Sequence, residues 1–182
     1  MKKTFKQYLL EYDKKEMPQS LSIDQLKKFL EFENNQETIK LKDNIQLNLY
    51  KLDSRHNCLM IKSNDKIIGY VMMHIFENTK YWQISSINLY SNKQEGIGTL
   101  IYEKLLNIDY ILINGTSLSI SAEKIWKKLI HKYNSGTFDK IENKIYQLDN
   151  RPTDDKGSTN SYETNQRYFW IISKDKLNYF KE

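Results

Sequence analysis

Two glycines lie where a strand-like segment gives way to a helical one. Trp82–Tyr90 is rich in strand-forming residues, and apolar residues then follow at helical spacing from Ile97 to Leu105. Between these segments, residues 93–99 read Lys-Gln-Glu-Gly-Ile-Gly-Thr. A helix start presents unpaired N–H groups, and glycine lets an anion approach them closely. The pattern therefore predicts either a pyrophosphate cradle or a tight turn that binds nothing.

The better-known phosphate loops do not fit this turn. A P-loop needs a Lys followed by Ser or Thr after its last glycine, and Gly98 is followed by Thr99-Leu100. A dinucleotide fingerprint needs a third glycine and an acidic residue after a second parallel strand, and neither is present. The turn therefore belongs to neither of these two classes.

Residues 93–98 resemble the acyl-coenzyme A loop of the GNAT acyltransferase superfamily, Arg/Gln-x-x-Gly-x-Gly/Ala, with Lys93 at its first position. Ser117–Leu129 is similar to the fourth helix of many bacterial and phage members. The resemblance covers residues 44–173 and implies an α+β fold. In that fold, helices cover both faces of a mixed, mostly antiparallel sheet of about six to seven strands, here preceded by an N-terminal helical segment.

The spacing of apolar residues predicts the order of the elements. We expect one domain at 44–182, with a mobile loop at 149–166, preceded by an N-terminal helical segment at 1–43 that is packed on it or tethered to it. Residues 34–43 read as irregular. The helices and strands are expected as follows: helices at 4–13, 22–30, 97–107 and from a Ser121 N-cap to Tyr133, and strands at 45–49, 57–62, 67–75, 82–90, 110–113, 138–148 and 167–173.

Composition sets limits on the class of protein. The 182 residues have a net charge of +5, with lysines spread along the chain, which suits an acidic ligand such as coenzyme A and permits nucleic acid. No apolar run is long enough to span a bilayer, and no secretory signal opens the chain, so we expect a cytoplasmic protein with no membrane partner. The single cysteine, Cys58, is either a buried small apolar residue or a catalytic thiol.

The resemblance also implies a function, an acyl-CoA-dependent N-acyltransferase. Acetyl-CoA would be the acyl donor and an unidentified amine the acceptor, with direct attack and no metal. Ile87 and Leu89 would pair with the pantetheine arm, and an N–H near Leu89 would polarise the thioester carbonyl. The pyrophosphate would be held by the loop and the start of the helix: Lys93, Gln94, Glu95, Gly96, Ile97, Gly98 and Thr99.

Two departures affect catalysis. The family's Ala-x-x-x-Tyr reads Ala122 to Trp126 here, and Trp has no proton of suitable pKa to give a leaving thiolate. Nor does Gln83–Tyr90 contain a carboxylate. The remaining candidates to handle a proton each have a structural alternative, namely helix caps for Ser119 and Ser121, a core-edge aromatic for Tyr133 and a packing histidine for His74.

Two other classes of function remain open. A catalytically degenerate domain would act as an interaction module, and residues 1–11 look like the capsid-targeting leader of phage head proteins, with a cleavage motif at Leu9-Leu10-Glu11. An ordinary amphipathic helix explains the same residues. The third class is modification of a nucleobase, which the basic charge permits. The sequence leaves the oligomeric state open.

Overall fold

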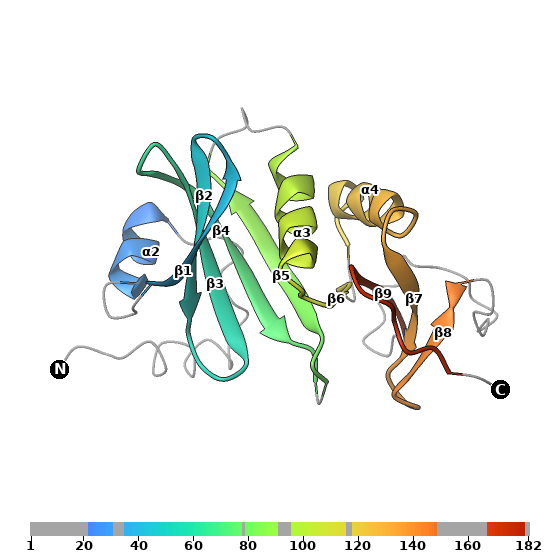
Figure 1. Ribbon diagram of the computed structural model, residues 1–182. Coiled ribbons are helices and arrows are strands. Elements are labelled where there is room, and N and C mark those ends of the chain that lie inside the picture. The colour runs from blue at the N-terminus through green and yellow to red at the C-terminus, as the bar shows by residue number, and fades with distance from the viewer. Residues whose placement is uncertain are drawn as a thin grey trace. The chain divides into compact units, whose positions relative to one another are not determined.

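The computed structural model in Figure 1 describes residues 22–30, 35–77, 79–90, 96–115, 118–148 and 167–180. The chain divides into two compact units. The first comprises residues 1–72 and 86–92, and the second comprises 73–85 and 93–182. Strands β4 (Lys66–Ile75) and β5 (Trp82–Leu89) pass from one unit into the other. The strand order is β1-β2-β3-β4-β5-β6-β9-β7-β8. In this part of the chain, no helix is long and apolar enough to cross a membrane.

The first unit is an antiparallel meander with one described helix. Besides its parts of β4 and β5, this unit contains the helix α2 (Ile23–Leu30) and the strands β1 (Asn35–Lys42), β2 (Ile45–Lys51) and β3 (His56–Ser63). Strand β2 pairs antiparallel with β1 on one side and β3 on the other. The turn from β3 to β4 uses Asn64 and Asp65 at φ values of 46° and 64°. Two-residue hairpins need such left-handed residues, and Asn and Asp adopt this conformation more readily than most.

The core of the first unit contains Cys58, which the sequence left as either a packing residue or a catalytic thiol. Leu26 of α2 packs with buried residues of β2, β3 and β4: Tyr50, Cys58, Met60, Tyr70 and Met72. Cys58 is fully buried, and burial raises the pKa of its thiol to about 12. Because a thiolate is strongly disfavoured there, Cys58 is a packing residue and not a nucleophile.

The second unit contains a parallel crossover followed by antiparallel strands. After β5 come α3 (Ile97–Asn107), β6 (Leu112–Ile113), α4 (Ile120–Leu129), β7 (Asn134–Asp139), β8 (Lys144–Gln147) and β9 (Tyr168–Ser173). Strand β6 is parallel to β5 and antiparallel to β9, which also pairs with β7. The aromatic core of this unit gathers around Phe76, Phe138 and Phe169, with the rings of Phe76 and Phe169 centred 4.9 Å apart.

The expected fold class is wrong. The sheet has nine strands rather than six to seven, and the described residues form only the helices α2, α3 and α4, so the chain is mostly sheet rather than an α+β fold with helices on both faces. Two local errors explain the extra strands. Residues 35–42 form β1 because their backbone pairs with β2, although most of their side chains are polar. The expected strand at 138–148 is broken at Lys140–Asn143 into the β7–β8 hairpin.

Other expectations concern single elements. The helix at 97–107 and the helix within 22–30 are confirmed. The helix at 4–13, the leader motif at residues 9–11 and the loop at 149–166 lie outside the described residues.

Candidate functional site

The start of α3 presents main-chain donors that no described side chain caps. Gly96 occupies the N-cap position with φ 81° and ψ −10°, a left-handed conformation that favours glycine. The first intrahelical bond runs from the Leu100 N–H to the Gly96 carbonyl at 3.2 Å. The N–H groups of Ile97, Gly98 and Thr99 therefore precede that bond and lie at the positive end of the helix dipole.

The two glycines of this turn have different roles. A Cβ added at Gly96 would meet no atom of the described residues within 4 Å. A Cβ at Gly98 would lie 3.1 Å from Cδ1 of Ile125 on α4. Gly98 therefore allows close packing of α3 against α4, while Gly96 sets the backbone conformation. Of the two glycines, only Gly96 has no described neighbour in the way of an added Cβ.

Strands β5 and β6 separate soon after they meet. Their parallel pairing consists of Trp82 with Leu112 and Gln83 with Ile113. Beyond it, the side-chain Nε2 of Gln83 donates to the Asn114 carbonyl at 2.7 Å. A side chain thus occupies the place of the next main-chain pair. Ile84 and Ser85, the next residues of β5, have no register partner on β6.

Asn114 fixes the end of β6 to the opposite neighbour. Its N–H donates to the Trp170 carbonyl at 3.0 Å, and its Oδ1 accepts from the Trp170 N–H. Both Asn114 and Gln83 are buried, so these bonds are shielded from water. Because β6 is also bonded to β9, its register with β5 ends at Gln83 and Ile113. The sequence analysis did not single out Gln83 or Asn114, although polar residues inside apolar strand segments were a signal.

The four candidate catalytic residues do not gather at one place. Ser119 is the N-cap of α4, and its Oγ accepts from the Ala122 N–H at 3.2 Å. Ser121 is exposed in the first turn and is not the N-cap that we expected. Tyr133 follows the other end of α4, with Lys132 Nζ 5.6 Å from its ring centroid. A helix of ten residues is about 15 Å long, so Tyr133 lies far from both serines.

His74 has a polar partner on the neighbouring strand. Its Nδ1 lies 2.7 Å from Oγ of Ser85. His74 is half-buried on β4 and Ser85 is exposed on β5. This contact joins His74 to the part of β5 that follows its last register pair with β6. Of the four candidates, His74 has a described contact with that part of β5.

Trp126 replaces the family's tyrosine with a core residue. Its ring is almost fully buried and lies edge-on to Tyr102 of α3, with centroids 5.8 Å apart. Burial raises the pKa of Tyr102 to about 12. Neither residue is placed to give up a proton readily, so this contact serves the packing of α3 on α4.

The remaining expected binding residues divide into two groups. Ile87 and Leu89 are half-buried in β5, in the part of it that belongs to the first unit. Lys93, Gln94 and Glu95 lie outside the described residues.

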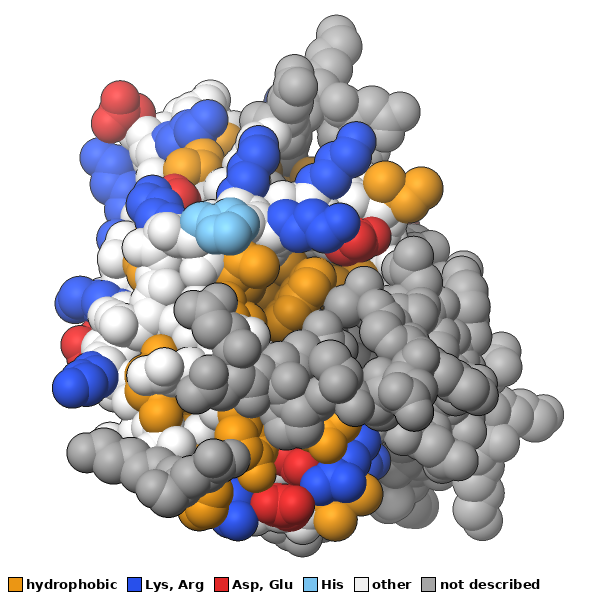
Figure 2. Space-filling model, turned by 90° about the vertical axis from the view of Figure 1, so that its right-hand side faces the viewer, with side chains coloured by type: hydrophobic (Ala, Val, Ile, Leu, Met, Phe, Trp, Pro, Cys, Tyr) orange, Lys and Arg blue, Asp and Glu red, His pale blue; other side chains and the backbone are white. Residues whose placement is uncertain are grey.

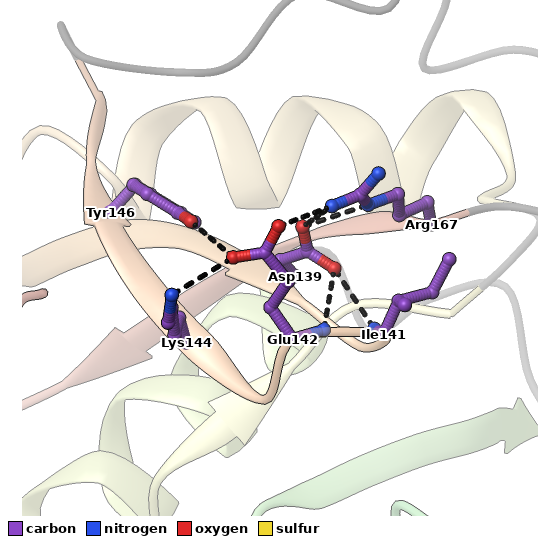
Figure 3. A network of polar contacts seen from close by, with 6 residues as sticks. All are labelled: Asp139, Ile141, Glu142, Lys144, Tyr146 and Arg167. Carbon is purple, nitrogen blue, oxygen red and sulfur yellow. Dashed lines mark hydrogen bonds and ion pairs between the residues drawn. The ribbon is translucent and has the colours of Figure 1, made fainter.

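A second polar cluster closes the β7–β8 hairpin (Figure 3). Asp139 is fully buried, accepts from Nε of Arg167 at 2.8 Å and accepts from the N–H groups of Ile141 and Glu142. Burial alone would raise its pKa, but these hydrogen bonds hold the pKa below its usual value. Arg167 also pairs with Glu142 at 2.9 Å. Because every charge in the cluster has a partner, we interpret it as a structural lock.

Figure 2 shows a row of basic side chains, with one histidine, along one face of the molecule. The exposed residues of α4 and the turn after it supply such a row: Lys124, Lys127, Lys128, His131 and Lys132. Two of these lysines are paired, Lys127 with Glu123 and Lys132 with Glu103, both at 2.6 Å. The lysines that look scattered in the sequence are thus gathered on one helix face.

Comparison with known proteins adds no family. No protein-family model and no curated protein sequence matches this chain.

Proposed function

We propose that this chain is an acyl-CoA-dependent N-acyltransferase that transfers an acetyl group from acetyl-CoA to an amine. The observation that carries the proposal is the uncapped start of α3, with left-handed Gly96, directly after the strand of a parallel pair. Ligands of open sheets bind beyond the carboxyl ends of parallel strands, and helix starts bind phosphates. The likeness of residues 93–98 to an acyl-coenzyme A loop supports the same ligand.

The residues at this site fit such a ligand. The N–H groups of Ile97, Gly98 and Thr99 would hold the pyrophosphate, and no described atom within 4 Å of a Cβ at Gly96 would obstruct it. The Ile84 carbonyl, beyond the last register pair of β5 with β6, would offer an acceptor to an extended arm. When bound, acetyl-CoA supplies an acyl group activated as a thioester.

His74 is the residue that we assign to remove the proton from the attacking amine. Its contact with Ser85 holds the imidazole at the part of β5 that follows its last register pair with β6. An imidazole has a pKa suited to a general base near neutral pH. The new C–N bond forms as the C–S bond breaks, and the proton from the amine ends on solvent or the departing thiolate. A cytoplasmic location is part of this proposal.

Calorimetric titration with acetyl-CoA tests the site. We expect micromolar binding that Gly96→Glu abolishes, because a carboxylate at the helix start repels phosphate. Asn107→Glu adds the same charge at the exposed far end of α3 and should bind normally. In a release assay for free thiol with a panel of amines, His74→Gln should lower kcat at least tenfold and leave the acetyl-CoA affinity unchanged. No binding to the native protein contradicts the proposal.

The basic face of α4 favours one second candidate, a protein that modifies nucleic acid. Lys124, Lys128 and His131 repeat at helical spacing, and phosphate backbones bind such faces. Retention on a DNA column should then fall steeply with salt, and Lys124→Gln with Lys128→Gln should weaken it. Passage through the column at low salt would exclude this candidate.

A further inference from the structure

A hollow of about 350 Å³ lies in the second unit, at the end of the sheet where β5 begins. Four segments form it: the approach to β5, Ile111 before β6, the β7–β8 hairpin and the chain after β9. None of the residues that line it belongs to the start of α3, so the hollow is separate from the acyl-CoA site proposed above. Its main lining residues are Lys80, Tyr81, Lys144, Lys176, Tyr179 and Phe180.

The charge of the lining is positive. It contains three lysines and no aspartate or glutamate. Lys144 forms an ion pair with Glu142, with its Nζ 3.1 Å from Oε2. Within the described residues, neither Lys80 nor Lys176 has a carboxylate at ion-pair distance, and both are exposed. Two unneutralised ammonium groups beside one hollow favour an anion.

The rings of the lining are held in place. Tyr81 packs edge-on against Phe138 with centroids 5.3 Å apart, and the hydroxyl of Tyr179 donates to the Ser135 carbonyl at 2.9 Å. Burial raises the pKa of both phenols, so they stay neutral and do not repel an anion. Phe180 keeps 42% of its surface exposed. The hollow thus offers flat apolar surface at little cost in side-chain entropy.

The backbone around these rings is also fixed. The Phe180 N–H donates to the Ile145 carbonyl at 2.7 Å, which ties the chain after β9 to β8. Leu177 is buried in the aromatic core of the unit. Lys144 lies over the Phe180 ring, with Nζ 3.9 Å from the centroid. The Phe180 ring, with the Lys144 ammonium over it, therefore keeps a set position in the hollow.

We propose that this hollow binds a nucleoside monophosphate. The ammonium groups of Lys80 and Lys176 would take the phosphate, and the base would lie against the aromatic lining. A volume of about 350 Å³ is within the range of small-ligand pockets. Asn143 and Asn178, also in the lining, offer amide groups to the polar edge of the base.

Titration of the full chain with three probes tests this proposal. AMP should bind at least tenfold more tightly than either inorganic phosphate or adenosine, because only AMP uses both halves of the hollow. Lys80→Gln with Lys176→Gln should weaken AMP binding at least tenfold. Lys51→Gln with Lys66→Gln changes the charge equally at exposed sites in the first unit and should leave it unchanged. Phe180→Leu should weaken AMP more than phosphate.

One further variant distinguishes binding in this hollow from binding at the proposed acyl-CoA site. AMP binding should persist in Gly96→Glu, which removes acetyl-CoA binding if the proposed function is correct. Loss of AMP binding in Gly96→Glu would place the nucleotide at α3 and overturn this inference. Equal affinity for AMP and phosphate, or normal AMP binding by the double lysine variant, would overturn it as well.

Discussion

The β7–β8 hairpin and the start of α3 both gather polar groups, but only one of them satisfies those groups internally. At the hairpin, the buried carboxylate of Asp139 has Arg167 and two N–H groups as partners. At α3, no described side chain caps the first N–H groups. The hairpin cluster therefore stabilises the fold, whereas the helix start is where we propose that a ligand binds. In this proposal, completeness of hydrogen bonding separates structural from binding polar groups among the described residues.

The largest effect is expected from breaking the satisfied cluster. Asp139→Ala removes three hydrogen bonds and leaves Arg167 and the N–H groups of Ile141 and Glu142 without this acceptor. We expect the free energy of unfolding to fall by about 3 kcal/mol, measured by urea denaturation. Asp175→Ala removes an exposed carboxylate and should change it by less than about 0.5 kcal/mol. Equal small losses in both variants would show that the cluster is not a lock.

Lowering the pH should gradually reduce the contribution of the Asp139 cluster to stability. The pKa of Asp139 is lower in the folded chain than in the unfolded chain, where it is about 4. Its contribution to stability is therefore complete above about pH 4 and is lost as the pH falls through the folded pKa. The stability difference between the native protein and Asp139→Asn should shrink from pH 5 to pH 2. A difference that stays constant over this range would contradict the assignment.

The smallest effects should distinguish the two glycines. Gly96→Ala forces a left-handed alanine and should cost about 1 kcal/mol, with or without Ile125→Val. Gly98→Ala is opposed by Cδ1 of Ile125, so removal of that methyl by Ile125→Val should turn the substitution neutral or stabilising. A double-mutant cycle measures both couplings. Coupling of Gly96, and not Gly98, to Ile125 would reverse the two roles.

Much of the local structure was predictable because it depends on neighbours in sequence. The apolar spacing from Ile97 to Leu105 predicted α3, and the strands expected at 57–62 and 67–75 are observed as β3 and β4. The sequence analysis predicted Ser121 as the N-cap of α4, but the N-cap is Ser119. Both are serines near the helix start, so the sequence pattern did not distinguish them. The polar run at 35–42 gave no warning of β1 because pairing with β2 decides it.

The candidate site was predictable in part. The helix start with Gly96 followed from the pattern of residues 93–99. Gln83 and Asn114 escaped notice because their importance comes from a hydrogen bond between residues 31 positions apart. The basic face of α4 was also missed, although its lysines stand at helical spacing.

The sequence by itself determined where α3 begins and that glycines would stand at its start, because helical spacing and the steric freedom of glycine act locally. Only the tertiary structure decided that Gly98 packs against Ile125, that Cys58 is inert and that the register of β6 with β5 ends at Ile113. Those properties depend on which distant segments meet. The physical reason is that burial and strand pairing are set by the whole chain, whereas backbone conformation is set by each residue and its neighbours.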